Sequence, residues 1–179
     1  MWKTIQSFLY IVGLLNLGYW LQLNLKARLS QTRGARELEH PGTSVSSPAA
    51  GEVVGRLEIP RLNMSTVVFE GADQDVLERG AGHLPGSALP GSPGNAVLAA
   101  HRDTFFRPLR DIRAGDVVKV HTPVSDNLYK VESARVVEAG EMDVLKPTPE
   151  PALTLITCYP FRYIGPAPER FVVRAVQAH

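Results

Sequence analysis

Short runs of apolar and β-branched residues, each ended by proline, glycine or another turn residue, recur through residues 52–179. The chain has 14 prolines and 15 glycines, which interrupt helices and favour turns. The runs cover residues 53–59, 65–69, 96–100, 117–120, 128–137, 153–158 and 171–176. Short strands at this spacing, with little helix between them, are typical of a β-sandwich or β-barrel. We expect about eight strands in a barrel that is closed or nearly closed.

Two short helical segments are expected within this region. Asp73 can cap a helix over residues 74–79, and Gly80 can end it. Residues 104–112 contain an internal proline, so this segment is predicted to form one or two turns at most.

Composition excludes several classes of protein. Hydrophobic residues make up 44% of the chain and charged residues 21%, as in globular proteins and unlike disordered or collagen-like chains. The net charge is +1, from 19 basic and 18 acidic side chains, so no electrostatic argument favours nucleic acid as a partner. Cys158 is the only cysteine in the sequence, which excludes an intramolecular disulfide and a cysteine-based zinc site.

The N-terminal end carries 22 residues without a charged side chain, from Thr4 to Leu25. As a helix this stretch would be roughly 33 Å long, enough for a hydrocarbon core of ~30 Å. The residues after Leu25 do not form a small-x-small cleavage site. We therefore predict an uncleaved transmembrane anchor helix over residues 4–25, and an amphipathic or buried core helix is the alternative.

Four parts of the chain are predicted: a short flank (1–3), the anchor (4–25), a flexible tether (26–51) and a folded domain (52–179). Residues 31–51 contain no aromatic and few large apolar side chains, too few to offset the entropy of ordering. The basic residues that follow the anchor outnumber the lysine before it. The positive-inside rule alone would therefore put the folded domain in the cytoplasm.

Cys158 ends the predicted strand 153–158, because Tyr159-Pro160 follows it. Alternation places its side chain on the same face as Ile156. A thiol at the end of a strand lies at the rim of a barrel, where a substrate can reach it. A lone cysteine is otherwise most often an inert buried thiol, and that alternative stays open here.

Arg170 begins the next predicted strand. If the two strands form an antiparallel hairpin, the end of the first faces the start of the second, and Cys158 and Arg170 become neighbours. A guanidinium stays protonated and can donate hydrogen bonds to a carbonyl or a developing oxyanion. Arg162 and Arg174 compete for this role, and Arg174 shares a face with Arg170 but lies four residues deeper.

Histidine is the natural partner for a nucleophilic thiol, which ordinarily titrates near pH ~8.5. His101 directly follows the strand 96–100 and is favoured over His83, which we expect in a Gly/Pro-rich loop. The other histidines are His40 in the tether, His121 at a strand end and the terminal His179.

Three motifs carry a resemblance to a known family: HRDTFF at residues 101–106, TLITC at 154–158 and ERF at 169–171. In this order the chain resembles the sortases, and class D most, over most of residues 53–177. Ala100 departs from the pattern, since the family often has glycine before the histidine.

The resemblance implies an all-β, eight-stranded sortase-type barrel with one or two short helices, preceded by the transmembrane helix. It implies that Cys158 is the nucleophile, His101 the acid/base and Arg170 the donor to the carbonyl or oxyanion. Such an enzyme is a membrane-anchored cysteine transpeptidase. It cuts a Leu-Pro-x-Thr-Gly-like sorting signal after Thr and passes the acyl group to an amine on a cell-wall precursor or protein. The implied location is single-pass in the cell membrane, with the catalytic domain outside the cytoplasm, against the charge count.

No cofactor is expected. Some sortases bind calcium, but the spacing of Glu138, Glu141 and Asp143 matches no EF-hand loop, so no metal is assigned. In sortases the loop before the cysteine strand, residues 138–152 here, helps select the substrate.

Two rival functions stay open. One is a thiol peptidase or thioesterase in which water resolves the acyl-enzyme. The other is a non-catalytic, membrane-tethered domain that binds peptides and buries Cys158. Asp103 could orient His101 or be an exposed turn residue, and Thr157 could line a substrate groove or only pack within its strand.

Overall fold

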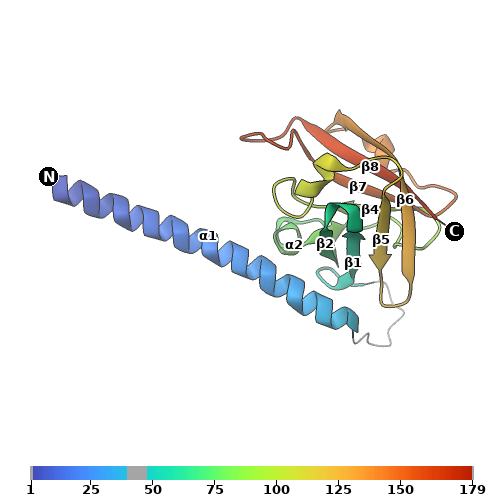
Figure 1. Cartoon of the computed structure of the whole chain (residues 1–179), viewed down its shortest axis with the longest axis horizontal. Coiled ribbons are helices and arrows are strands. Elements are labelled where there is room, and N and C mark those ends of the chain that lie inside the picture. Colours follow the sequence, from blue (N-terminus) through green and yellow to red (C-terminus); the bar gives the residue numbers. More distant parts are fainter. Residues whose placement is uncertain (1, 40–47, 179) are drawn as a thin grey trace.

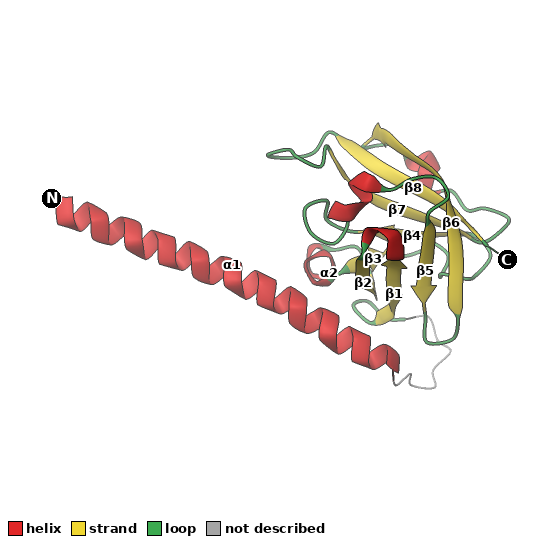
Figure 2. Cartoon of the chain, viewed as in Figure 1, coloured by secondary structure: helices red, strands yellow, loops and turns green. Residues whose placement is uncertain are grey.

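The structure, a computed structural model, describes residues 2–39 and 48–178 (Figure 1). Eight strands close into a barrel in the order β1-β2-β3-β4-β7-β8-β6-β5. A long helix at the N-terminus of the chain extends away from the barrel (Figure 2). The strands are β1 (Val53–Ile59), β2 (Met64–Glu70), β3 (Ala81–His83), β4 (Asn95–Ala99), β5 (Val117–His121), β6 (Asp126–Glu138), β7 (Ala152–Tyr159) and β8 (Glu169–Gln177). The α-helices are α1 (Trp2–Glu39) and α2 (Gln74–Arg79), and the 3₁₀ helices are η1 (Pro60–Leu62), η2 (Arg107–Asp111) and η3 (Met142–Leu145).

The predicted eight-stranded barrel is confirmed, and every strand except β3 coincides with a predicted apolar run. The short helix α2 also lies where its capping residues placed it. The Asp73 side chain accepts a hydrogen bond from the Val76 backbone N–H at 3.1 Å, and Gly80 is the C-cap. Local sequence signals therefore predicted most of the elements.

The strand β3 was missed, because Ala-Gly-His contains no β-branched residue and reads as part of a loop. It forms because it pairs parallel with β2 and antiparallel with β4. Gly82 permits the close approach, since a Cβ there would collide with the backbone oxygen of Gly71. The expectation that His83 lies in a loop is wrong, because His83 is buried on this strand.

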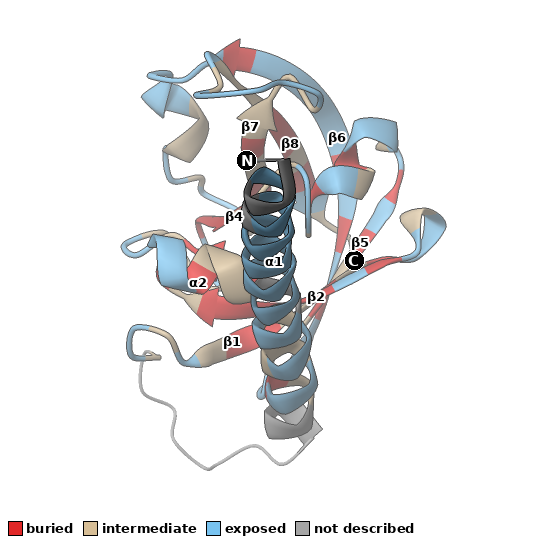
Figure 3. Cartoon of the chain, turned by 90° about the vertical axis from the view of Figure 1, so that its left-hand side faces the viewer, coloured by how far each residue is buried: buried red, intermediate tan, exposed pale blue. Residues whose placement is uncertain are grey.

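Alternate residues of the strands fill the barrel interior. Leu98 of β4, Leu155 of β7 and Val173 of β8 are fully buried in one core cluster. The residues between them point to the opposite face. Thr154 and Val172 are covered on that face as well, whereas Cys158 and Arg170 near the strand ends are only half-buried. Figure 3 shows buried positions on the strands, whereas α1 is exposed along most of its length.

The helix α1 extends beyond the predicted anchor (4–25) and continues as far as Glu39. Residues 26–39, predicted as part of a flexible tether, are therefore helical. They are rich in Ala, Arg, Leu and Glu and contain no proline, so their intrinsic helix propensity is high. The remaining tether residues 40–47, which include His40, lie outside the described residues, as does His179.

The N-terminal part of α1 has the length and composition of a membrane span. A helical segment between Ile5 and Ala35 is apolar enough to cross a bilayer, judged by length and composition alone. Its large apolar side chains are not covered by the barrel: Leu14 and Leu15 are each 68% exposed. This finding is consistent with the predicted anchor.

An ion pair holds η1 against the start of β5. Arg61 Nη2 donates to Asp116 Oδ2 at 2.6 Å, and the Arg113 backbone N–H donates to the same carboxylate oxygen at 2.8 Å. The Asp116 side chain is only 7% exposed. The hydrogen bond from Arg61 holds the pKa of Asp116 below its ordinary value of 3.8.

We predict that Asp116→Asn lowers the stability of the protein at neutral pH and flattens its acid dependence. A carboxyl group with a lowered pKa in the folded state stabilises the fold fully above the pKa of the unfolded chain. That stabilisation is lost as the pH falls through the folded pKa. Thermal unfolding between pH 2 and 7 measures the effect. Asp111→Asn, at an exposed carboxylate nearby, is the control, and equal Tm profiles for the two variants would contradict the prediction.

Candidate active site

Cys158 lies on the outer face of β7, one residue before the strand ends at Tyr159. Leu153 and Leu155 point into the core, and the alternation puts Cys158 on the opposite face with Ile156. The thiol is partly exposed and has no disulfide partner. The thiol is therefore not fully buried, unlike in the alternative considered above.

Arg170 lies directly opposite Cys158. The antiparallel pairing of β7 with β8 puts the two residues in register, so the predicted neighbourhood of Cys158 and Arg170 is confirmed. The Arg170 Nη1 group donates to two backbone oxygens of its own loop, Ala167 at 3.1 Å and Glu169 at 2.9 Å. These bonds hold the guanidinium at the start of β8.

The pairing of β4 with β7 adds His101 to Cys158 and Arg170, so that the three residues form a row across adjacent strands. The two strands are parallel, with Ala99 opposite Ile156. Two residues further on, the same register puts His101 opposite Cys158 and on the same outer face. Neighbouring strands lie about 4.8 Å apart, so the three side chains come from adjacent strands at one rim of the barrel.

Two hydrogen bonds continue the β4–β7 pairing up to His101. The Ala100 backbone N–H donates to Ile156 O at 3.3 Å, and the Thr157 hydroxyl donates to Ala100 O at 2.7 Å. The Phe106 backbone N–H then donates to His101 O at 3.1 Å, while the Phe106 ring is fully buried. Thr157 is thus more than a strand-packing residue, because it fixes the backbone next to His101.

The competing histidines have other surroundings. His83 is 2% exposed, with Nδ1 2.6 Å from Glu70 Oε2 and Nε2 2.9 Å from Ala88 O. Both of its ring nitrogens are used inside the fold, so His83 is a structural residue. His121 ends β5, where its Nδ1 lies 2.7 Å from Asp126 Oδ1, and β5 is not a neighbour of β7 in the barrel.

The other polar candidates lie outside the row. Arg162 is an exposed loop residue, and Arg174 faces Thr154, four residues along β8 from Arg170. Asp103 is exposed and makes no hydrogen bond to His101 among the described contacts.

Three aromatic rings surround the end of β7. Tyr159 and Phe171 stack with ring centroids 6.3 Å apart, and Phe161 packs edge-on against Phe171 at 5.2 Å. These contacts order the chain on both sides of Cys158 and give the rim an apolar border.

Asn95, at the start of β4, is a positioning residue that the sequence did not reveal. It accepts a hydrogen bond from the buried Thr154 hydroxyl at 2.7 Å. Its Nδ2 donates to Val144 O at 3.1 Å and to Lys146 O at 3.2 Å. It therefore ties the β6–β7 loop to the outer face that carries Cys158. An isolated asparagine before an apolar run carries no signal of such long-range bonds.

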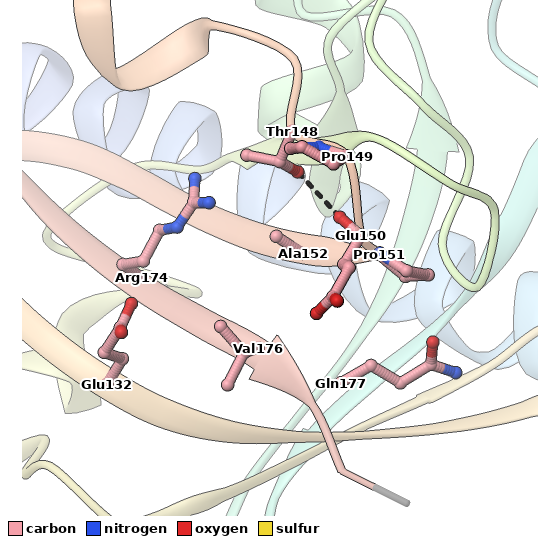
Figure 4. Close-up of a pocket in the computed structure, with 9 residues that line it drawn as sticks. All are labelled: Glu132, Thr148, Pro149, Glu150, Pro151, Ala152, Arg174, Val176 and Gln177. Atoms are coloured by element: carbon pink, nitrogen blue, oxygen red, sulfur yellow. Dashed lines mark hydrogen bonds between the residues drawn. The ribbon is translucent and has the colours of Figure 1, made fainter.

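Two cavities open on this outer face. A cavity of about 650 Å³ lies at the far end of β7 and β8 and is lined by Glu132, Thr148, Pro149, Glu150, Pro151, Ala152, Arg174, Val176 and Gln177. Figure 4 shows the loop residues Thr148 and Glu150, joined by a hydrogen bond of 2.8 Å, across from Arg174. A second cavity of about 240 Å³ includes Val144, Thr154 and Arg174. Cys158 lies about 20 Å along the strand from Ala152.

Two of the three carboxylates considered for calcium pair with cations instead. Asp143 lies 2.8 Å from Lys146 and Glu141 lies 3.3 Å from Arg135, and Lys146 lowers the pKa of Asp143. Among the described residues no group of three or more His, Cys, Asp or Glu side chains is arranged to hold a metal.

The sequence profile of the sortase domain matches residues 57–178. The chain is 31% identical to Sortase D of Bacillus subtilis, over 96% of this chain and 96% of that protein. It is 32% identical to Sortase A of Listeria monocytogenes, over 65% of this chain and 55% of that protein. The chain therefore belongs to the sortase family, whose members are cysteine transpeptidases that act on proteins with sorting signals. The match to Sortase D over nearly the whole chain confirms the predicted resemblance to class D.

Solved structures agree with this assignment. Sortase C1 of Streptococcus suis has a TM-score of 0.67 at 30% identity and covers 83% of this chain, which spans 79% of that structure. The sortase D5 transpeptidase of Clostridium perfringens has a TM-score of 0.75 over 86% of this chain and 99% of that one. At 23% identity, the second likeness shows the fold alone.

We predict that Thr157→Val destabilises the fold and slows the chemistry at Cys158. The valine removes the donor to Ala100 O, and a buried carbonyl left without its partner costs about 1–3 kcal/mol. Denaturant unfolding measures the stability, and the kcat of peptide cleavage measures the effect on His101. Thr157→Ser keeps the hydroxyl and is the control; if Val and Ser variants have the same kcat, Thr157 does not position His101.

Proposed function

We propose that this chain is a membrane-anchored transpeptidase that cleaves a Leu-Pro-x-Thr-Gly-like sorting signal after Thr and transfers the acyl group to an amine. The observation that carries the proposal is the row formed by His101, Cys158 and Arg170 on adjacent strands at one rim of the barrel. A partly exposed thiol beside an imidazole and a guanidinium is suited to covalent acyl transfer.

In the proposed reaction, the Cys158 thiol gives its proton to His101, and the sulfur attacks the carbonyl carbon of the substrate threonine. The resulting tetrahedral oxyanion accepts hydrogen bonds from Arg170 and from backbone N–H groups. His101 protonates the departing amine as the C–N bond breaks, which leaves a thioester on Cys158. The incoming amine loses its proton to His101 as it attacks the thioester, and this step releases the thiol and the new amide. Such two-step catalysis gives ping-pong kinetics.

Two hydrogen bonds restrain the guanidinium of Arg170, the proposed donor to the oxyanion. Its Nη1 bonds to Ala167 O and Glu169 O orient one edge toward the loop, and a planar guanidinium then has its remaining N–H groups in fixed directions. A donor that is oriented before the substrate arrives needs little reorganisation in the transition state.

The substrate would bind along the outer face of β7 as an extended peptide. The β6–β7 loop, held to this face through Asn95, and the cavities along β7 and β8 support a role in selecting the sorting signal. The amine acceptor would be a cell-wall precursor or a protein.

The α1 span would anchor the enzyme in the cell membrane as a single-pass protein with its catalytic domain outside the cytoplasm. The exposed apolar side chains of α1 support the anchor. The extracytoplasmic side is the one on which sorting signals and cell-wall amines meet.

Hydrolysis is the alternative outcome at the same three residues, since water can resolve the thioester. The decisive experiment incubates the full chain in detergent with a Leu-Pro-x-Thr peptide library, with and without an amine. Mass spectrometry reads the thioester on Cys158 and the products. Amide products support the transpeptidase, and free acids in the presence of amine support a peptidase. Failure of native Cys158 to react with a thiol reagent would support a peptide-binding module.

We predict that Cys158→Ala abolishes cleavage, because without the sulfur no thioester can form. Product formation from a sorting peptide, followed by mass spectrometry, measures the loss. Val124→Ala, at an exposed residue of the β5–β6 turn, is the matched control for handling and folding. Cleavage by the Cys158 variant at the unmodified rate would end the proposed mechanism.

We predict that Arg170→Lys lowers kcat by ~10²–10³, the usual cost of losing an oxyanion donor. Lysine keeps the charge but lacks the planar fork, so it cannot bond the loop carbonyls and face the oxyanion together. Arg162→Lys makes the same change at an exposed residue of the same loop and is expected to keep its activity. Near-native turnover by the Arg170 variant would remove Arg170 from the site.

A further inference from the structure

The part of α1 that follows the predicted span packs against the barrel. Its covered residues recur at helical spacing and are small or polar: Ala27, Ser30, Gln31, Gly34 and Ala35. A Cβ at Gly34 would lie 2.8 Å from a Val67 methyl group on β2. Glycine at this position therefore permits the helix to approach the strand closely.

The Gln31 side chain links α1 to two backbone groups of the barrel. Its Oε1 accepts from the Val67 N–H at 2.7 Å, and its Nε2 donates to Arg79 O at 2.7 Å. The Gln31 side chain thus bridges β2 and the C-terminal end of α2, which precedes the short strand β3. Lys26, one turn earlier, lies 3.6 Å from Asp75 and 3.3 Å from Glu78 of α2. These contacts fix the direction of α1 relative to the barrel.

This direction puts the loop between β7 and β8 on the side of the barrel that the N-terminal half of α1 points toward (Figure 1). The tip of the loop is apolar and exposed: Tyr163 is 48% and Ile164 is 101% exposed. Arg162 precedes them and is also exposed. A basic residue followed by an aromatic and an aliphatic side chain is suited to the headgroup region of a bilayer.

The loop tip is braced from the His101 segment. Arg102 Nη2 donates to Tyr163 O at 2.9 Å and to Gly165 O at 3.4 Å. The Arg102 guanidinium also lies 5.7 Å from the centre of the Tyr163 ring. Because Arg102 directly follows His101, the position of the tip is coupled to the rim that carries Cys158.

We propose that the tip of the β7–β8 loop, residues 162–165, inserts Tyr163 and Ile164 into the surface of the bilayer that α1 spans. The docked helix and this tip are two membrane contacts on one rigid body, and they hold the rim with Cys158 close to the bilayer. The proposal rests on the membrane anchoring described under the proposed function. A bilayer is the occupant that the geometry favours, because the anchor itself brings the lipid to this side of the barrel.

The test uses the full chain in lipid vesicles of phosphatidylcholine and phosphatidylglycerol, in a Cys158→Ala background. Ile164→Cys is labelled with an environment-sensitive fluorophore, and quenching by lipids with a nitroxide at the headgroup or upper acyl chain is measured. Val124→Cys is the matched control, since Val124 is 79% exposed and lies in the β5–β6 turn, near the C-terminal end of α1 in Figure 1. We expect a blue-shifted emission and a severalfold stronger quenching at position 164 than at position 124.

A second variant tests the docking. Gln31→Ala combined with Gly34→Leu removes the amide link and crowds Val67, so we expect weaker quenching at position 164 while the protein still floats with the vesicles. Equal quenching at 164 and 124 in vesicle-bound protein overturns the membrane contact but leaves the anchor intact. A chain that does not float with vesicles overturns both the anchor and this inference.

Discussion

The parallel pairing of β4 with β7 is the interaction on which the candidate site depends. It brings His101, at the end of one strand, beside Cys158, at the end of a strand more than fifty residues later. Thr157 and Phe106 extend that pairing past the last regular residue of β4, one by a hydroxyl and the other by a buried ring. Without these two supports, a histidine just beyond a strand end would be free to move away from the thiol.

The antiparallel pairing of β7 with β8 adds Arg170 to the row of His101 and Cys158. The two faces of these strands serve different purposes, one for the core and one for the candidate site. The inner face, with Leu155 and Val173, belongs to the core. The outer face carries Cys158 and Arg170 at one end and the larger cavity at the other. Because alternation assigns each side chain to one face, the core can hold the site rigidly while the site stays open to substrate.

The contacts of α1 fix the position of the site relative to the predicted membrane span. A flexible connection would let the barrel take any orientation, whereas Gln31 and Gly34 hold the helix against β2. A fixed helix decides which loops lie on the side toward which its N-terminal half points, and the β7–β8 loop beside Cys158 is one of them (Figure 1). The candidate site and the predicted anchor helix are thereby parts of one rigid arrangement.

Local signals in the sequence determined the apolar span, the cap of α2 at Asp73, nearly all strands and the presence of a thiol at a strand end. These depend on neighbours within a few residues, so they can be read along the chain. Only the tertiary structure decided the rest. The strand β3 exists through its partners, His83 is buried through Glu70 and Ala88, Asn95 acts through a distant loop, and Gln31 holds α1 against β2. Each of these depends on contacts between segments far apart in the chain, and no local pattern encodes which segments will meet.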